Sequence, residues 1–313
     1  TTNGGASWIN QLVPGTGLLD RCLALSDQIC FASGKNGNLY RTTNGGASWT
    51  VVHSSTADYN RIFFINNLTG WVTATNAFFK TTDGGTTWQQ SAMTGSNKGV
   101  HFVNELTGWV CSYPNVQKTT NGGATWQTYL VSNYGNVFYE VVFTNELTGY
   151  IAGSANNYYD GRIFKTTNGG VNWSMQNFTT SNGLYALQMI NQGTGYAVGD
   201  GGVAFKTTNA GEVNSGWIYS QIQSVNNDLN SVKFINQFTG WSSGGNGTLI
   251  KSTDGGISWL PLASGTTSFI TSVNFYNPST GWFTSTGGVK KSTDGGSSWV
   301  SLAGAGSSTY NSI

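Results

Sequence analysis

Short apolar segments, broken by glycine and asparagine, recur along the whole chain. The stretch 230–262 shows the pattern, with segments at 230–235, 239–244, 248–252 and 258–262. Each segment is rich in β-branched and aromatic residues, and Gly, Asn or Asp separates it from the next, which is typical of strands joined by tight turns. No stretch carries a sustained helical stripe with caps. The pattern predicts an all-β chain built from units of four short strands.

The units are marked by a box, Thr/Ser-Thr-Asn/Asp-Gly-Gly-x-x-Trp, which occurs eight times, once in a stretched form at 207–217. The boxes begin at Thr1, Thr42, Thr81, Thr119, Thr166, Thr207, Ser252 and Ser292. Their tryptophans follow at steps of 41, 39, 38, 47, 44, 42 and 40 residues. A second phrase, Asn-x-x-Thr-Gly-Trp/Tyr, occurs at 66–71, 104–109, 145–150, 191–196, 236–241 and 277–282.

Four strands every ~40 residues are typical of a propeller blade. An open solenoid is the alternative, but it needs atypical polar repeats at its ends, and the sequence has none. We therefore expect a single domain over 1–313, a seven-bladed β-propeller of four-stranded antiparallel blades. Seven repeats run from 18 to 303, after a leading box and strand at 1–17 and before a C-terminal tail at 304–313.

The leading strand is surplus to seven blades. Either this strand or the strand of the last box, at 298–302, closes the last blade. The other is left as an extra terminal strand, which lies on an outer edge or adds to another copy of the chain. The candidate inter-subunit strand consists of Ser7, Trp8, Ile9, Asn10, Gln11 and Leu12.

Composition narrows the class of partner. Only 9% of the 313 residues are charged and the net charge is +1, so no electrostatic argument favours nucleic acid or an acidic membrane surface. No apolar run is long enough to insert into a membrane. The chain starts in mid-repeat without Met or a signal peptide, and we expect a processed product whose export signal lies upstream.

Three cysteines occur, too few for a disulfide framework. Cys22 and Cys30 fall on two consecutive predicted strands and could face each other across a hairpin. A disulfide formed in an oxidising compartment is one interpretation, and two buried thiols are the other.

A structural role accounts for the residue types of the box. Its Asn or Asp can bond nearby backbone groups in a tight turn, its glycines accept positive φ, and its Trp buries a large surface. Five boxes carry Asn and three carry Asp (Asp83, Asp254 and Asp294), a mixture that calcium ligation at every blade would not tolerate.

The box resembles the Asp-box, or bacterial neuraminidase repeat. Together with the Thr-Gly-Trp phrase, it makes nearly the whole chain similar to the photosystem II stability/assembly factor family of propellers and to related secreted bacterial surface proteins. That resemblance implies a propeller fold. The assembly factors are associated with an arginine-rich patch, whereas this chain has only Arg21, Arg41, Arg61 and Arg162.

Candidate chemistry is sparse. The chain has two histidines, His53 and His101, and lacks the His-Glu-x-x-His, Cys-x-x-Cys and phosphate-loop motifs. Glu105 and Glu146 occupy equivalent turn positions in neighbouring units, which indicates a role in the repeat rather than a glycosidase pair. We therefore predict no catalytic residues, no metal site and no cofactor.

A cation precedes each box of the seven complete units. One interpretation is a cationic ring that binds an anionic partner; the other is a set of aliphatic stems packed along aromatic residues with their charged heads in water. The seven residues are Arg41, Lys80, Lys118, Lys165, Lys206, Lys251 and Lys291.

We expect a non-enzymatic propeller, extracellular or at a cell surface, that serves as a structural or binding module. Its partner would be another protein or copies of itself through the surplus strand, with glycan as a further option. The alternatives are an assembly chaperone for a membrane protein complex and a carbohydrate-binding or glycoside-active propeller.

Overall fold

The computed structural model describes residues 19–34, 37–112, 114–132, 136–155, 160–176, 178, 180–212, 216–222 and 225–301. Within them the chain forms seven β-sheets, and the only helical segments are two 3-10 turns, η1 (Asp200–Gly202) and η2 (Gly245–Gly247). The prediction of an all-β chain with seven blades of four antiparallel strands is confirmed. The leading strand from Ser7 to Leu12 lies outside the described residues.

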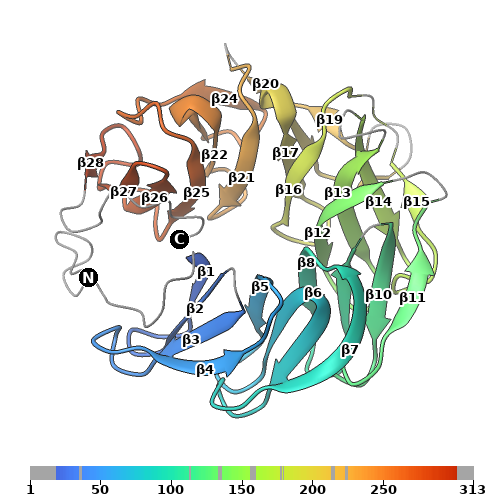
Figure 1. Cartoon of the computed structure of the whole chain (residues 1–313). Helices are drawn as coiled ribbons and strands as arrows, with labels where there is room; N and C mark the ends of the chain where they lie inside the picture. Colours follow the sequence, from blue (N-terminus) through green and yellow to red (C-terminus); the bar gives the residue numbers. More distant parts are fainter. Residues whose placement is uncertain are drawn as a thin grey trace. The chain divides into compact units, whose positions relative to one another are not determined.

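Each blade is an antiparallel meander in which consecutive strands are neighbours (Figure 1). The strands of the first four blades are β1 (Leu19–Ala24), β2 (Cys30–Gly34), β3 (Asn38–Thr42), β4 (Thr50–Ser54), β5 (Tyr59–Phe64), β6 (Gly70–Thr81), β7 (Gln89–Ser96), β8 (Gly99–Phe102), β9 (Gly108–Cys111), β10 (Asn115–Thr119), β11 (Gln127–Leu130), β12 (Val137–Phe143), β13 (Gly149–Ala155), β14 (Asp160–Thr166) and β15 (Ser174–Met175).

The last three blades repeat the same order. Their strands are β16 (Leu184–Met189), β17 (Gly195–Gly199), β18 (Ala204–Thr207), β19 (Ile218–Tyr219), β20 (Gln221–Ile222), β21 (Leu229–Phe234), β22 (Gly240–Gly244), β23 (Leu249–Ser252), β24 (Ser258–Pro261), β25 (Ile270–Phe275), β26 (Gly281–Ser285), β27 (Gly288–Ser292) and β28 (Val300–Ser301).

The chain divides into two compact units, and the boundary crosses β13 and β14. One unit contains 11–151 and 164–174; within it the first strands of successive blades are neighbours, β1 with β5, β5 with β8 and β8 with β12. The other unit contains 1–10, 152–163 and 175–313, and there β16 contacts β21 and β21 contacts β25. In both units the first strand of each blade is therefore packed against the first strand of the next.

The second blade departs from the repeat. The single strand β6 serves as its second and third strands, because residues 70–74 pair with β5 and residues 77–80 pair with β7. The chain turns at Asn76, whose φ of 57° lies in the left-handed region that Asn tolerates. With eight residues, β7 is longer than any other fourth strand described, since β4 has five and β11 and β24 have four.

The outer edges of the last two blades are occupied differently. In the last blade β28 pairs with β27, so the strand of the chain's own last box takes the fourth position. In the blade before it, β20 adds in parallel to the fourth strand β24, giving a five-stranded sheet. An outer blade edge in this chain can therefore accept an additional strand.

The described residues include no helix long and apolar enough to cross a bilayer.

Candidate functional site

In the seven boxes that the structure describes, the first hydroxyl holds the turn. Thr81 Oγ1 donates to Asp83 Oδ1 at 2.8 Å and accepts the N–H of Gly85 at 2.8 Å, while Asp83 Oδ1 accepts the N–H of Thr87 at 3.0 Å. Box Trp88 closes the turn by donating from Nε1 to the Gly85 carbonyl at 3.2 Å. These donors, led by the backbone N–H of Thr87, lower the pKa of Asp83 to about 2.

The same turn forms around asparagine. Thr119 Oγ1 donates to Asn121 Oδ1 at 2.9 Å and accepts the N–H of Gly123 at 2.9 Å. An amide oxygen and a carboxylate oxygen accept the same bonds, which explains why the boxes mix Asn with Asp.

The two repeated phrases bond to each other across neighbouring blades. In four copies of the phrase, the aromatic residue that follows Thr-Gly donates to the carbonyl of the first box glycine of the next blade. The bonds are Trp71 Nε1 to Gly122 at 2.9 Å, Trp109 Nε1 to Gly169 at 3.0 Å, Tyr196 Oη to Gly255 at 3.0 Å and Trp241 Nε1 to Gly295 at 3.1 Å.

Each donor also stacks on a phenylalanine from the first strand of that next blade. Trp109 lies 3.4 Å from Phe143 between ring centroids, at an interplanar angle of 7°, and Trp173 then meets Phe143 edge-on at 86°. Trp71 with Phe102 and Trp241 with Phe275 repeat the stack at 3.6 Å and 6°. Aromatic pairs favour these offset and edge-on geometries, so the stacks tie the blades together.

Six of the seven predicted cations lie over the ring of the aromatic residue that follows Thr-Gly in their own blade, or of Phe31 at the equivalent position of the first blade. Lys206 pairs in register with Tyr196, and Lys251 Nζ donates to the Gly295 carbonyl at 3.0 Å. Burial lowers the pKa values of Lys118 and Lys206. The distances to ring centroids are Arg41 to Phe31 6.0 Å, Lys80 to Trp71 5.8 Å, Lys118 to Trp109 5.5 Å, Lys165 to Tyr150 6.0 Å, Lys251 to Trp241 5.2 Å and Lys291 to Trp282 5.7 Å.

These are cation–π distances, with each charged head over a ring. Binding of an anionic partner by the cationic ring stays a prediction.

The turn acids bridge neighbouring blades. Asn66 Nδ2 donates to Glu105 Oε1 at 2.7 Å, and Asn104 Nδ2 donates to Glu146 Oε1 at 2.7 Å. Within the described residues no group of three or more His, Cys, Asp or Glu side chains could hold a metal ion.

Sequence reasoning missed an ion pair between first strands. Arg61 on β5 pairs with Glu140 on β12, although β8 lies between those strands in the order of blades. Gly99 on β8 makes room, because a Cβ there would meet the Glu140 Cα at 3.1 Å. Burial raises the pKa of Glu140, opposed by the charges of Arg61 and Arg21. Periodicity could not reveal the pair, since it is made once rather than in every repeat.

The hairpin predicted for Cys22 and Cys30 forms, but the two residues are not joined in a disulfide. Cys22 pairs with Ala32 and Cys30 with Ala24, so the cysteines are diagonal neighbours. Diagonal positions on an antiparallel pair are about 7–8 Å apart, beyond the usual Cα separation of a disulfide.

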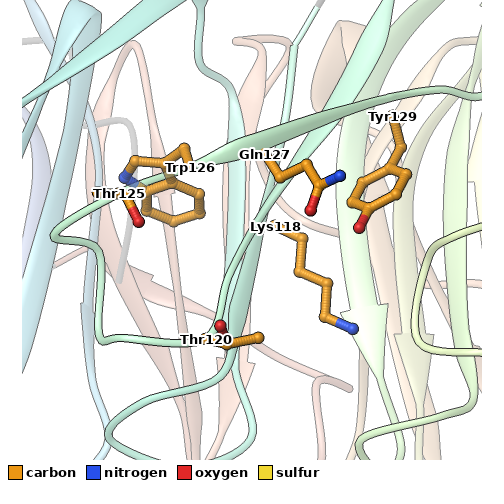
Figure 2. A pocket seen from close by; sticks show the side chains of 6 residues that line it. All are labelled: Lys118, Thr120, Thr125, Trp126, Gln127 and Tyr129. Carbon is orange, nitrogen blue, oxygen red and sulfur yellow. The ribbon is translucent and has the colours of Figure 1, made fainter.

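Two cavities lie in the unit that begins at 11. The smaller, about 200 Å³, lies beside the β10–β11 hairpin of the third blade (Figure 2). In Figure 2 Trp126 lies to one side of the Lys118 stem and Tyr129 to the other, with Gln127 above the stem. Ligand pockets usually measure about 300–1,000 Å³, so this cavity is small for a ligand.

The larger cavity, about 740 Å³, lies between the end of β4 and the β6–β7 hairpin. Its lining residues are His53, Ser54, Ser55, Thr56, Ala57, Asp58, Thr75, Asn76, Ala77, Phe79 and Gln90. Sequence reasoning missed it, because residues of two blades form it at the place where the second blade departs from the repeat.

Equivalent turns of three consecutive blades expose leucines, which we call the turn leucines: Leu68, Leu106 and Leu147, with exposed fractions of 60%, 57% and 60%. The Leu106 turn is anchored, since Asn104 Oδ1 accepts the N–H of Leu106 at 2.9 Å and Gly122 donates to the Leu106 carbonyl at 2.8 Å. The turn leucines are thus held outward on fixed backbone.

No protein-family model matches the chain, and no curated protein sequence matches it. Solved structures do match it in fold. YCF48 from Cyanidioschyzon merolae is 16% identical with a TM-score of 0.67, covering 92% of this chain and 97% of that one. The fold is that of a β-propeller.

Two further structures support the same fold. YCF48 bound to D1 peptide is 19% identical with a TM-score of 0.65, covering 94% of this chain and 97% of that one. A GH74 xyloglucanase from Xanthomonas campestris is 14% identical with a TM-score of 0.66, covering 93% of this chain but 54% of the enzyme. At these identities the likeness concerns the fold, which binding proteins and enzymes share.

Proposed function

We propose that this chain is a non-catalytic propeller that binds a protein partner through its turn leucines, outside the cytoplasm. The observation that carries the proposal is the outward presentation of Leu68, Leu106 and Leu147 on three successive anchored turns. Apolar side chains gathered on one part of a surface mark sites of protein association. The low charge content and the abundance of Thr, Asn and Ser favour an extracellular or cell-surface location.

The acids support a structural rather than a catalytic assignment. Asp83 is held in its box, Glu105 and Glu146 accept inter-blade hydrogen bonds, and Glu140 is paired with Arg61. A glycosidase needs two carboxyl groups that face a common substrate site, one as acid and one as base or nucleophile. These four acids are instead engaged with neighbouring protein groups.

An assembly factor for a membrane protein complex is the second candidate, favoured by the likeness to YCF48 bound to D1 peptide. In that case the partner would be a segment of a membrane protein. Association between copies through the leading strand is a third form of protein binding, and electron microscopy of the purified protein tests it. Filaments are the expected result for that form, and separate single particles would exclude it.

The test of the main proposal is cross-linking of the tagged protein in its native cells. We expect a discrete protein adduct that disappears when all three turn leucines are changed to Ser. Leu130→Ser is the matched control, because Leu130 is similarly exposed (55%) but lies on the outer strand β11. An adduct that survives the triple substitution, or release of reducing sugars from xyloglucan by the wild-type protein, would overturn the proposal.

A further inference from the structure

The larger cavity lies at the opposite ends of the blades from the turn leucines. In a four-stranded antiparallel meander, the turn between the first and second strands and the turn between the second and third lie at opposite ends. The turn leucines occupy the first kind of turn, whereas Asn76 forms the second kind and Ser55 to Asp58 follow the fourth strand β4. This cavity is therefore independent of the protein-binding face.

We propose that this cavity binds a short, neutral oligosaccharide. Its volume of about 740 Å³ falls within the usual range for ligand pockets. Six of its lining side chains carry a hydroxyl or a carboxamide: Ser54, Ser55, Thr56, Thr75, Asn76 and Gln90. Such groups both donate and accept hydrogen bonds, as sugar hydroxyls do.

The lining discriminates against other ligands. It contains one carboxylate, Asp58, and no Lys or Arg, so an anionic ligand would meet no countercharge. The apolar members give little surface, because Ala77 and Phe79 are buried at 5% and 1% exposure and the half-buried Ala57 has only a methyl group. A peptide with apolar side chains would gain little burial here, whereas a hydroxylated ligand would gain hydrogen bonds.

The walls are fixed before a ligand arrives. Asn76 Oδ1 accepts the N–H of Gly95 at 2.9 Å, and Asn97 Nδ2 donates to the Ala74 carbonyl at 2.9 Å, which together hold the extended end of the β6–β7 hairpin. On the other wall the N–H of Ser55 donates to Gly37 at 2.7 Å. A preformed site spends little free energy on ordering when it binds.

His53 supplies an aromatic ring to the lining of the cavity. Its Nδ1 lies 2.5 Å from the Tyr59 hydroxyl, and its ring lies 4.4 Å from the Phe79 ring. Burial lowers the pKa of His53, so the ring is neutral at physiological pH and can pack against the C–H face of a sugar.

Two lining groups are open for a ligand. The Gln90 carboxamide and the Asn76 Nδ2 make no hydrogen bond with the described side chains or backbone, and both residues are exposed. Gln90 lies on the long strand β7 and pairs with Phe79 on β6. The extra length of β7 is specific to this blade among the fourth strands described. The site therefore depends on the departure from the repeat.

The test is calorimetric titration of the whole chain with cellotriose, maltotriose, xylotriose and chitotriose. At least one should bind, and Asn76→Gly with Gln90→Ala should weaken that binding about tenfold or more through loss of two hydrogen bonds. Glycine keeps the left-handed backbone at position 76. Gln89→Ala is the matched control, since Gln89 is exposed on the same strand but does not line the cavity.

Binding that is equal in the double variant, or no binding of any of the four sugars, would overturn the assignment. Tighter binding of an acidic sugar such as galacturonic acid trimer would also contradict it. The turn-leucine variant should bind the sugar normally, so this site and the protein-binding face are tested separately.

Discussion

Trp71 and Gly122 are 51 residues apart in sequence, yet the indole N–H of Trp71 donates to the Gly122 carbonyl at 2.9 Å. The phrase Thr-Gly-Trp of one blade is thus completed by the box of the next. Trp109, Tyr196 and Trp241 make the same bond to a box glycine of the next blade, which is why the two phrases recur with one period. In the first blade Phe31 stacks on Phe64 at 4.9 Å but has no N–H to donate.

Substitution of Trp109 should be among the most destabilising in the chain. Trp109→Phe keeps the stack on Phe143 but removes the donor to Gly169, and we expect a loss of about 1–3 kcal/mol of unfolding free energy because that carbonyl is left unsatisfied. Trp109→Ala also removes the stack and should cost about 3–5 kcal/mol. Urea unfolding followed by circular dichroism measures both, and equal losses would contradict the hydrogen bond's role.

Gly108→Ala should lower the stability of the fold, because the new methyl group would lie too close to a neighbouring ring. A Cβ at Gly108 would collide with the ring of Phe102, which is itself stacked on Trp71 and cannot move away easily. Overpacking of this kind costs about 1–3 kcal/mol. Gly245→Ala is the control, because the nearest atom to its Cβ would be 3.7 Å away. Thermal unfolding should separate the two variants, and similar melting temperatures would argue against the contact.

Asp83 should make one box sensitive to acid. Its pKa is lowered to about 2, so the stabilisation that it contributes is present above the ordinary aspartate pKa of about 3.9 and is lost as the pH falls toward 2. Asp83→Asn should leave neutral stability nearly unchanged, as the Asn boxes imply, and should reduce the acid-induced loss. Stability curves between neutral pH and pH 2 measure this; a large neutral loss in Asp83→Asn would be inconsistent with it.

Glu140 should give the opposite pH dependence. Burial raises its pKa, so the folded state holds the proton more tightly than the unfolded chain, and stability relative to Glu140→Gln should decline as the pH rises through the raised value. Glu140→Ala alone should cost about 1–2 kcal/mol at neutral pH by stranding Arg61, whose side chain is 33% exposed. Adding Arg61→Met should recover part of that loss in a double-mutant cycle, and strictly additive losses would exclude coupling.

The candidate sites differ in how far sequence could reach them. The period alone predicts that Lys118 and its counterparts recur before each box. It does not predict that the Lys118 ammonium lies over the ring of Trp109. The pair Arg61–Glu140 and the cavity around Asn76 depend on which blades become neighbours, and neither recurs. Pattern analysis detects what is repeated, whereas these features are single.

The sequence by itself determined the blade: its strands, its box turn and its number of copies, because alternation and turn chemistry act over a few residues and recur with each period. Tertiary structure alone decided how blades join, since the bond from Trp71 to Gly122 and the stack on Phe102 need contacts between segments distant along the chain. It also decided that β28 fills the outer position of the last blade. Edge pairing depends on which backbone groups remain unbonded after the sheet has formed, and no local pattern records that.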